Sequence, residues 1–292
     1  MLIHAIRVLL PVMGVFCLTG NMLSGGEYKP DFFRGVNAGQ KFRCEAKADY
    51  LAEHYLRGSI ESAKTTFKNL RIELAGILTV TQTLEAQPVG LELKIEQFAC
   101  LENGVKYQLA LDGRTVIIRR GGDGKTIFAF NAPGAAVAAK DASLLGMIFD
   151  FGTIQPSGRT IWGYPGIIHT GSSWSPDLEI FRGQLLRLNL RPEKMAGRVA
   201  LKERREVFGT DCLMLDMEIS CFFAAGETCA VSCHAAFPAD NAVYGPVKNN
   251  LSILHKRQIK LPENEPLAAG QTMHSEEKFQ LETLMLPLKS EK

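Results

Sequence analysis

Residues 212–223, CLMLDMEISCFF, contain the clearest structural signal in this chain. Apolar side chains recur there at every second position. These positions are Leu213, Leu215, Met217, Ile219 and Cys221. A period of two is typical of a strand that buries one face and exposes the other to water. Five inward positions in succession indicate a long strand of an antiparallel sheet.

The same alternation extends over much of the chain. Further runs cover residues 41–48, 90–99, 107–111, 116–119, 126–130, 184–190, 198–208, 251–261 and 278–286. Within 90–99 the phase shifts at Phe98, as a β-bulge would cause. Asp112-Gly113 is a strong hairpin signal, with the strand over 116–119 as the return strand. The sequence therefore predicts a mainly β protein, with a curved antiparallel sheet or half-barrel.

Helical signal is confined to two short stretches. The Ala-rich residues 134–148 include Asp141, which we interpret as the N-cap of a helix over 142–149. Residues 48–64 form the second candidate, although Gly58 interrupts it. A turn-rich stretch over 152–174, with both tryptophans, suggests two sub-halves, 27–165 and 166–292.

The composition is that of an ordinary globular protein. Of 292 residues, 46% are hydrophobic and 22% are charged, which excludes a disordered or fibrous chain. The formal net charge is +2, which excludes a strongly basic nucleic-acid binder. We therefore expect no nucleic-acid partner.

Residues 1–26 have the pattern of a secretory signal peptide. His4 and Arg7 give a weakly positive start, 8–18 is an apolar run, and 19–26 is a small, polar cleavage region. The run is too short for a transmembrane helix. We expect a secreted or periplasmic domain over 27–292 without a transmembrane segment. A lipid anchor at Cys17 is disfavoured, because its neighbours do not match a lipoprotein signal.

Six cysteines follow this leader, and an even number in an exported chain suggests disulfide bonds. They are Cys44, Cys100, Cys212, Cys221, Cys229 and Cys233. We prefer a bond between Cys44 and Cys100, with the other four paired among themselves. Two alternatives remain open: a metal site in which Cys221, Cys229, Cys233 and His234 are ligands, or buried free thiols.

Catalytic motifs are absent from the sequence. Gly124-Lys125-Thr126 resembles the end of a P-loop, but the pattern lacks its first glycine and a strand follows. The histidines are scattered, and no serine stands in a nucleophile turn. Carboxylates cluster at Glu203, Glu206, Asp211, Asp216 and Glu218, and we interpret them as a solvated strand face. We expect no catalytic residue, cofactor or metal.

The order of several short motifs resembles a family of uncharacterised exported bacterial β-domains of unknown function. These motifs are GQKFRCEA at 39–46, Leu144–Phe149, Gly171-Ser-Ser-Trp174 and GTDCLMLD from Gly209, within residues 38–260. The family is related in architecture to the LolA/LolB-like half-barrels, which carry lipoproteins or lipids. The resemblance implies a curved sheet with an apolar concave face and assigns no functional residue.

These observations lead to three hypotheses about function. The first is a non-enzymatic envelope protein that binds a lipid, a lipoprotein or another apolar ligand. The second is a structural scaffold of the cell envelope with an exposed sheet edge that meets a protein partner. The third is a hydrolase with a dispersed active site, which needs a nucleophile or a carboxylate pair beside a base.

Overall fold

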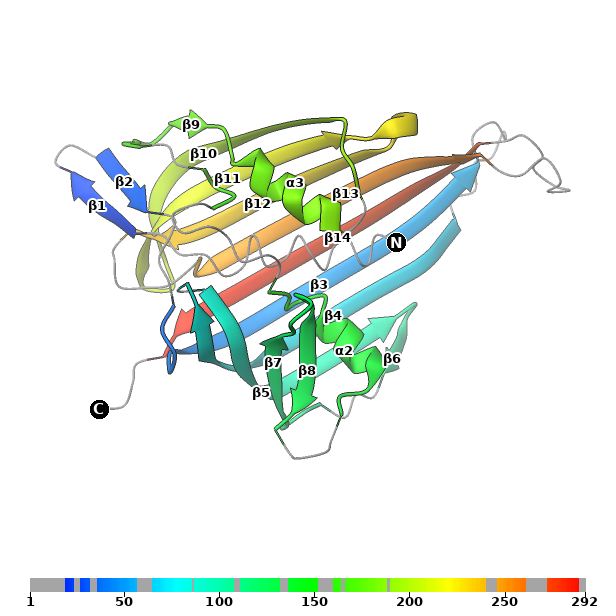
Figure 1. Ribbon diagram of the computed structural model, residues 1–292, viewed down its shortest axis with the longest axis horizontal. Helices are drawn as coiled ribbons and strands as arrows, with labels where there is room; N and C mark the ends of the chain where they lie inside the picture. Colours follow the sequence, from blue (N-terminus) through cyan, green and yellow to red (C-terminus); the bar gives the residue numbers. More distant parts are fainter. Residues whose placement is uncertain are drawn as a thin grey trace, which may run out of the picture.

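A computed structural model shows the arrangement of the chain in space (Figure 1). It describes residues 19–23, 27–31, 36–56, 65–85, 87–107, 111–131, 136–151, 160–163, 166–187, 190–239, 246–260 and 272–288. Most of the predicted leader, including Cys17, and the segment around Gly58 lie outside these residues. Part of the predicted cleavage region forms β1 (Thr19–Leu23), which pairs with β2 (Glu27–Asp31).

One antiparallel sheet of 12 strands makes up most of the protein. In sheet order its strands are β8 (Thr126–Phe130), β7 (Thr115–Arg120), β5 (Gln87–Glu102), β4 (Thr65–Leu84), β3 (Lys41–Leu56), β14 (Thr272–Pro287), β13 (Lys248–Lys260), β12 (Thr228–Pro238), β11 (Thr210–Phe222), β10 (Lys194–Val207) and β9 (Ser173–Trp174), and β6 (Val105–Tyr107) pairs with β5. The predicted fold class, a curved antiparallel sheet with few helices, is confirmed.

The first and last long strands meet in the middle of the sheet. β14 pairs with β3 from Met273 opposite Leu56 to Pro287 opposite Phe42. Figure 1 shows the two strands side by side at the centre, with the earlier strands on one side and the later strands on the other. The two predicted sub-halves therefore share one continuous sheet.

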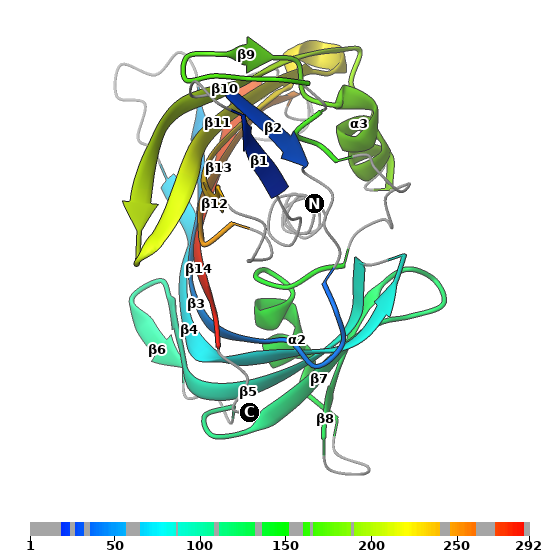
Figure 2. The same cartoon turned by 90° about the vertical axis from the view of Figure 1, so that its left-hand side faces the viewer.

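The sheet curls into an open half-barrel, and two helices lie on its concave side (Figure 2). These are α2 (Ala139–Leu145) and α3 (Leu178–Arg187). Asp177 precedes α3, and the backbone N–H of Ile180 donates to its Oδ1 at 3.4 Å, which is an N-cap contact. The helices place apolar side chains against the concave face.

The structure corrects three predictions of local structure. Residues 48–56 belong to the strand β3, because alternate residues of this stretch, Ala48, Tyr50 and Ala52, are buried against the core. Residues 184–187 belong to α3 and not to a strand, since Ile180, Phe181 and Leu185 share one buried helical face. Asp141 lies inside the first turn of α2, whose N-cap is Ala138.

The predicted bulge is confirmed, the predicted hairpin is wrong, and some strands were missed. The phase shift before Phe98 is a bulge, because Ala75 pairs with Gln97 and Gly76 pairs with Ile95, which leaves Glu96 as an extra residue. Asp112-Gly113 lies in a turn, but β6 and β7 each pair with β5 rather than with each other. The sequence reasoning did not identify β4 or β12.

Candidate functional site

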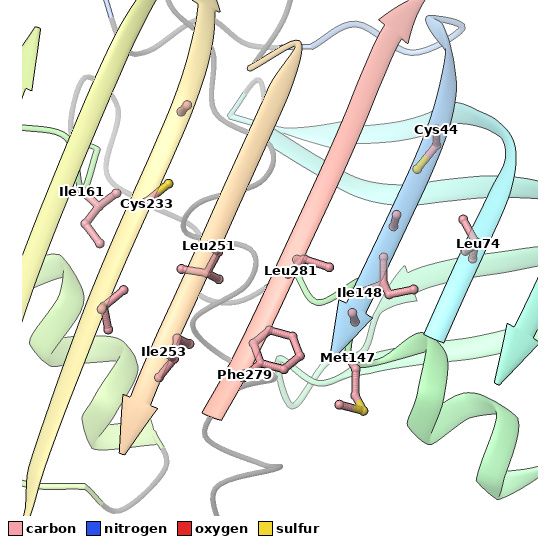
Figure 3. Close-up of a cluster of buried hydrophobic side chains, with 14 of the residues drawn as sticks. Cys44, Leu74, Met147, Ile148, Ile161, Cys233, Leu251, Ile253, Phe279 and Leu281 are labelled. Carbon is pink, nitrogen blue, oxygen red and sulfur yellow. The ribbon is translucent and has the colours of Figure 1, made fainter. Parts of the chain in front are cut away.

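The concave face consists of alternate residues from the central strands. On β3 these are the even-numbered residues, and they are mostly small. They are Phe42, Cys44, Ala46, Ala48, Tyr50 and Ala52, each at most 4% exposed. Figure 3 shows Cys44 here together with Phe279 and Leu281 of β14.

The strand register aligns these residues into apolar rows across the sheet. One row runs from Ala48 to Leu281, Leu251 and Cys233, and each of these residues faces the next. The row beside it contains Tyr50, Phe279, Ile253, Val231 and Ile219. All of these side chains belong to one hydrophobic cluster. The concave face is therefore a continuous apolar surface over five central strands.

Segments between β8 and β10 cover part of this surface. Their buried apolar residues include Leu145, Met147 and Ile148 at the end of α2, and Phe181 and Leu185 of α3, all in the same cluster. Figure 3 places Met147 and Ile148 over β3 and β14.

The tryptophans take part in this cover. The Trp162 ring packs edge-on against Phe237 with centroids 5.0 Å apart, and Trp174 Nε1 donates to the Trp162 carbonyl at 2.6 Å. Gly163, between them in sequence, has a φ of +72°, and a Cβ there would lie 2.6 Å from the Ser175 carbonyl oxygen. Trp162 is therefore buried in the core, and Trp174 is half-buried against it.

At one end of the concave face the inward-facing residues are polar instead of apolar. We name the cluster of these residues the polar end. It comprises Tyr50, Glu227, His255, Arg257, Ser275 and Glu277. His255 and Arg257 have the same strand parity as Leu251 and Ile253, so they face the same side. Sequence reasoning missed this cluster, although polar residues at inward positions of an alternating strand were a readable signal.

The carboxylates of Glu277 and Glu227 contact the other polar side chains of the polar end. Tyr50 Oη donates to Glu277 Oε2 at 2.8 Å, and Arg257 Nη2 lies 3.6 Å from Glu277 Oε1. His255 Nε2 lies 2.5 Å from Glu227 Oε1. Because a carboxylate only accepts, this histidine nitrogen carries the proton and donates. Each carboxylate therefore has a cationic or hydrogen-bonding partner.

The surroundings shift the ionisation of two of these groups. Burial and the hydrogen bond to Glu277 raise the pKa of Tyr50 well above its ordinary value. The hydrogen bond from His255 lowers the pKa of Glu227, although partial burial acts in the other direction. Tyr50 thus stays a neutral donor and Glu227 stays a carboxylate at neutral pH.

All six cysteines after the predicted leader are buried free thiols in the structure. The preferred bond between Cys44 and Cys100 is not compatible with the register, because Cys44 pairs with Gly76 whereas Cys100 pairs with Ile72. Two strand spacings and a four-residue offset separate them by more than about 10 Å, beyond the reach of a disulfide. Cys221 and Cys229 lie opposite each other on β11 and β12.

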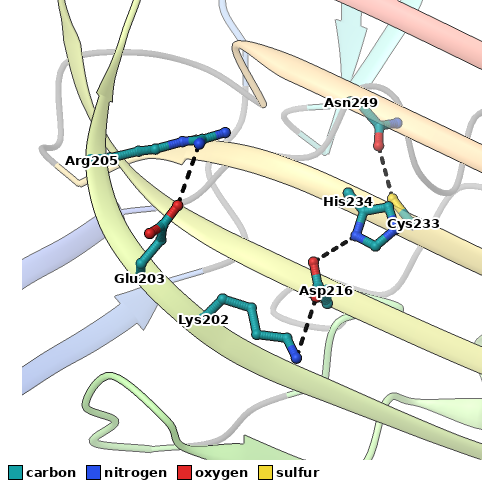
Figure 4. Close-up of polar contacts among 7 residues, drawn as sticks. All are labelled: Lys202, Glu203, Arg205, Asp216, Cys233, His234 and Asn249. Atoms are coloured by element: carbon teal, nitrogen blue, oxygen red, sulfur yellow. Dashed lines mark hydrogen bonds and ion pairs between the residues drawn. The ribbon is translucent and has the colours of Figure 1, made fainter.

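The alternative metal site does not assemble. Cys221, Cys229 and Cys233 face the concave side, whereas His234 faces the convex side and its Nδ1 lies 2.7 Å from Asp216 Oδ1 (Figure 4). In the part of the chain that the structure describes, no three His, Cys, Asp or Glu side chains are placed to hold a metal ion. Cys233 Sγ instead donates to Asn249 Oδ1 at 2.8 Å.

The candidate carboxylates of β10 and β11 form surface ion pairs. Asp216 Oδ2 lies 3.5 Å from Lys202 Nζ, and Glu203 Oε1 lies 3.4 Å from Arg205 Nη1 (Figure 4). Asp211 pairs with Arg204, which lowers the pKa of that carboxyl. Their interpretation as a solvated face is confirmed, and they form no pair facing a cleft.

A groove of about 400 Å³ lies on the convex face beside the β10–β11 turn. The apolar residues that line the groove include Phe208, which is 62% exposed, and Leu284. The charged residues that line it are Arg43, Lys47, Lys248, Glu45, Glu73 and Glu282. Three positive and three negative side chains therefore line the groove.

The outer strands bear on the scaffold hypothesis. β9 pairs only with Val199 and Ala200 of β10, and no other described residue forms a ladder along that edge of the strand. The rest of β10 is strongly charged, with the sequence KERRE at 202–206. At the opposite edge Ala129 of β8 forms one isolated bridge with Ala136. The charged edge at β10 opposes strand addition.

Comparisons with known proteins give little. No known family profile matches the chain, and no curated protein matches it. One similar solved structure is entitled "Lipid-protein interactions in lipovitellin", with 10% identity and a TM-score of 0.38. The similarity covers 88% of this chain and 26% of that one, so the chain spans about a quarter of that protein. Among the described residues, no helix is long and apolar enough to span a bilayer.

Proposed function

We propose that this protein is an exported carrier that binds an apolar or amphipathic ligand, such as a lipid or the acyl chains of a lipoprotein, along its concave face. The observation that supports this proposal is the set of apolar rows across the central strands. Four of the six buried side chains on β3 are small, and these residues, Cys44, Ala46, Ala48 and Ala52, alternate with more exposed ones.

The small side chains are informative because the interior of a protein is close-packed, so other atoms must fill the space that they leave. Two layers that pack directly on each other normally interdigitate large aliphatic side chains. On β3 the strand supplies little volume of its own, and other segments of the chain bury these residues to at most 4% exposed, so a bound ligand would displace part of that cover. An acyl chain suits such a face, because each buried methylene contributes about 0.8 kcal/mol.

Native mass spectrometry of the exported full-length chain, purified without detergent, tests the proposal. We expect a lipid-sized adduct that organic solvent releases. Ala48→Leu fills part of the face from β3 and should lower the occupancy of the adduct. Lys47→Leu adds the same side chain on the opposite face of the same strand, and it should leave the occupancy unchanged.

The absence of any adduct, together with no uptake of a fluorescent acyl probe by the extracted protein, would overturn the proposal. Equal occupancy in the Ala48→Leu and Lys47→Leu variants would place the ligand away from the concave face.

A further inference from the structure

A pocket lies near one edge of the sheet, where β7 begins and β8 ends. Its volume is about 380 Å³, which is within the range of small-molecule sites. Four residues line this pocket: Arg114, Thr115, Phe130 and Asn131. The backbone N–H of Asn131 donates to the Thr115 carbonyl at 3.2 Å, and this bond holds the two strand ends together. The pocket is therefore framed by paired strands.

Arg114 is the one charged residue among these four. Its guanidinium carbon lies over the Phe130 ring, 5.0 Å from the ring centroid. This cation–π contact orients the guanidinium, and a guanidinium has five N–H donors. Arg114 forms no ion pair with any residue that the structure describes. Its N–H donors are therefore available to a ligand in the pocket.

The charges beside the pocket leave this cation uncompensated. Lys94 pairs with Thr115 across β5 and β7 and adds a second positive charge. The carboxylate of Asp112 is the negative group that precedes Arg114, and its Oδ1 accepts the backbone N–H of Phe98 at 2.6 Å. A site with two positive groups and one negative group attracts an anion.

The sequence next to these strands adds no further charge. Residues 108–110 are QLA and residues 132–135 are APGA, and neither stretch contains a charged side chain. The local charge therefore depends on the three residues named above.

The lining also limits the kind of anion. A guanidinium binds a carboxylate or a phosphate through two parallel hydrogen bonds. The Thr115 hydroxyl and the Asn131 amide can each donate a hydrogen bond without adding charge. One guanidinium with neutral donors matches an oxyanion of single charge, because a dianion would keep one charge without a close partner.

An apolar row of the concave face ends at this pocket. Phe130 pairs with Val116, which pairs with Leu93, and the row continues through Leu78 to Phe42. The last four are buried members of the hydrophobic cluster, and Phe130, which is half-buried, packs against it. The site therefore joins a cationic head-group pocket to an apolar surface, which is the pattern that an amphipathic anion requires.

We propose that this pocket binds the singly charged oxyanion head group, a carboxylate or a phosphodiester, of an amphipathic ligand whose chain follows the apolar row. This inference rests on the proposed function and names the head-group class of its ligand. Arg114 provides charge-assisted hydrogen bonds to the oxyanion. Phe130 positions the guanidinium and contacts the start of the chain, which displaces part of the cover over the row.

A binding experiment on the full-length chain, first extracted to remove bound lipid, tests this assignment. Oleate and methyl oleate have the same chain and differ in the charge of the head group. Oleoyl lysophosphatidylglycerol carries the same chain on a phosphodiester. Each is supplied from cyclodextrin at about pH 8, where the carboxyl group is ionised, and native mass spectrometry measures the bound fraction. We expect oleate to bind at least about tenfold more tightly than methyl oleate, the effect of one charge-assisted hydrogen bond.

Arg114→Gln removes the charge and keeps a hydrogen-bonding side chain. The affinity for oleate should then fall to within about threefold of that for methyl oleate, which should itself be unchanged. Arg119→Gln is the matched control. It removes an equal charge from β7 on the face opposite to the buried residues Val116 and Ile118, and it should leave the preference for oleate intact.

The outcomes separate the two proposals. If none of the three molecules binds to the parent protein, the proposed function fails. If all three bind equally, the apolar face binds chains but the head-group assignment is wrong. A preference for the anions that survives Arg114→Gln would also overturn the assignment. A preference that Arg114→Gln abolishes supports it, and the anion that binds more tightly identifies the oxyanion.

Discussion

The two faces of the central sheet are built from the same strands and have opposite chemistry. On β3 the buried residue Ala48 stands between Lys47 and Asp49, which both face the convex side. On the concave side a single hydrophobic cluster runs across all the central strands. On the convex side ion pairs connect neighbouring strands, such as Arg71 with Asp49 at 2.7 Å.

This difference indicates how much each face contributes to the stability of the fold. Ion pairs between exposed side chains contribute about 0–1 kcal/mol each, and salt screens them. Buried apolar side chains contribute about 1.5–3 kcal/mol each. The convex face therefore keeps the sheet in solution, whereas the concave face stabilises the fold and, in our proposal, binds the ligand.

The largest expected effect comes from truncating a concave side chain. Phe279 is fully buried in the second apolar row. Phe279→Ala should lower the free energy of unfolding by about 3–5 kcal/mol, because it removes buried apolar area and leaves a cavity. Urea denaturation measures the change. Gln280→Ala, on the exposed face of the same strand, should change it by less than about 0.5 kcal/mol. Similar losses in both variants would contradict the division between the faces.

A smaller effect is expected within the polar end. Tyr50→Phe removes the hydroxyl that donates to buried Glu277 and keeps the ring. We expect a loss of about 1.5–3 kcal/mol in urea denaturation, the range for a hydrogen bond to a charged group. Tyr55→Phe is the matched control, because Tyr55 stacks on His274 through its ring, which the substitution preserves. A Tyr50→Phe variant as stable as the parent would show that water replaces the hydroxyl.

Alternation predicted the fold class because each long strand buries one face, as 212–222 does in β11. It failed for 48–56, where only the pairing with the neighbouring strands decides between a helix and a strand. It also failed for 184–187, because the helix depends on the cap at Asp177 and on burial against the sheet. The polar end could not be assembled from sequence, since β3 and β14 are more than 200 residues apart and become neighbours only through the strand order of the sheet.

Lowering the pH should weaken the polar end before it affects the apolar rows. The hydrogen bond from His255 lowers the pKa of Glu227. A carboxyl whose pKa is lower in the folded state contributes stability above its unfolded pKa, and this is lost as pH falls through the folded pKa. The free energy of unfolding should therefore fall as the pH drops from about 5 to about 3. Glu227→Gln should reduce this slope. Glu218→Gln, which removes an exposed convex carboxylate, is the control of equal charge, and an equal slope change there would refute the assignment.

The smallest effect is a difference in thiol reactivity, without any change in stability. Burial raises the pKa of Cys44, Cys221 and Cys229 to about 12. At pH 8 only roughly one thiol in ten thousand is then a thiolate, which is the reactive form. These three concave cysteines should react with iodoacetamide only after unfolding.

Cys212 faces the convex side in a small separate cluster with Ala236 and Val247. Opening that cluster exposes far less apolar surface than opening the concave face, so Cys212 should be labelled first. Peptide mapping by mass spectrometry measures the order. Labelling of Cys44 as fast as Cys212 would mean that the concave face opens readily in the native state. A mass two hydrogens light on the peptides of Cys221 and Cys229 would instead reveal a disulfide bond between these opposed residues, which an oxidising compartment favours.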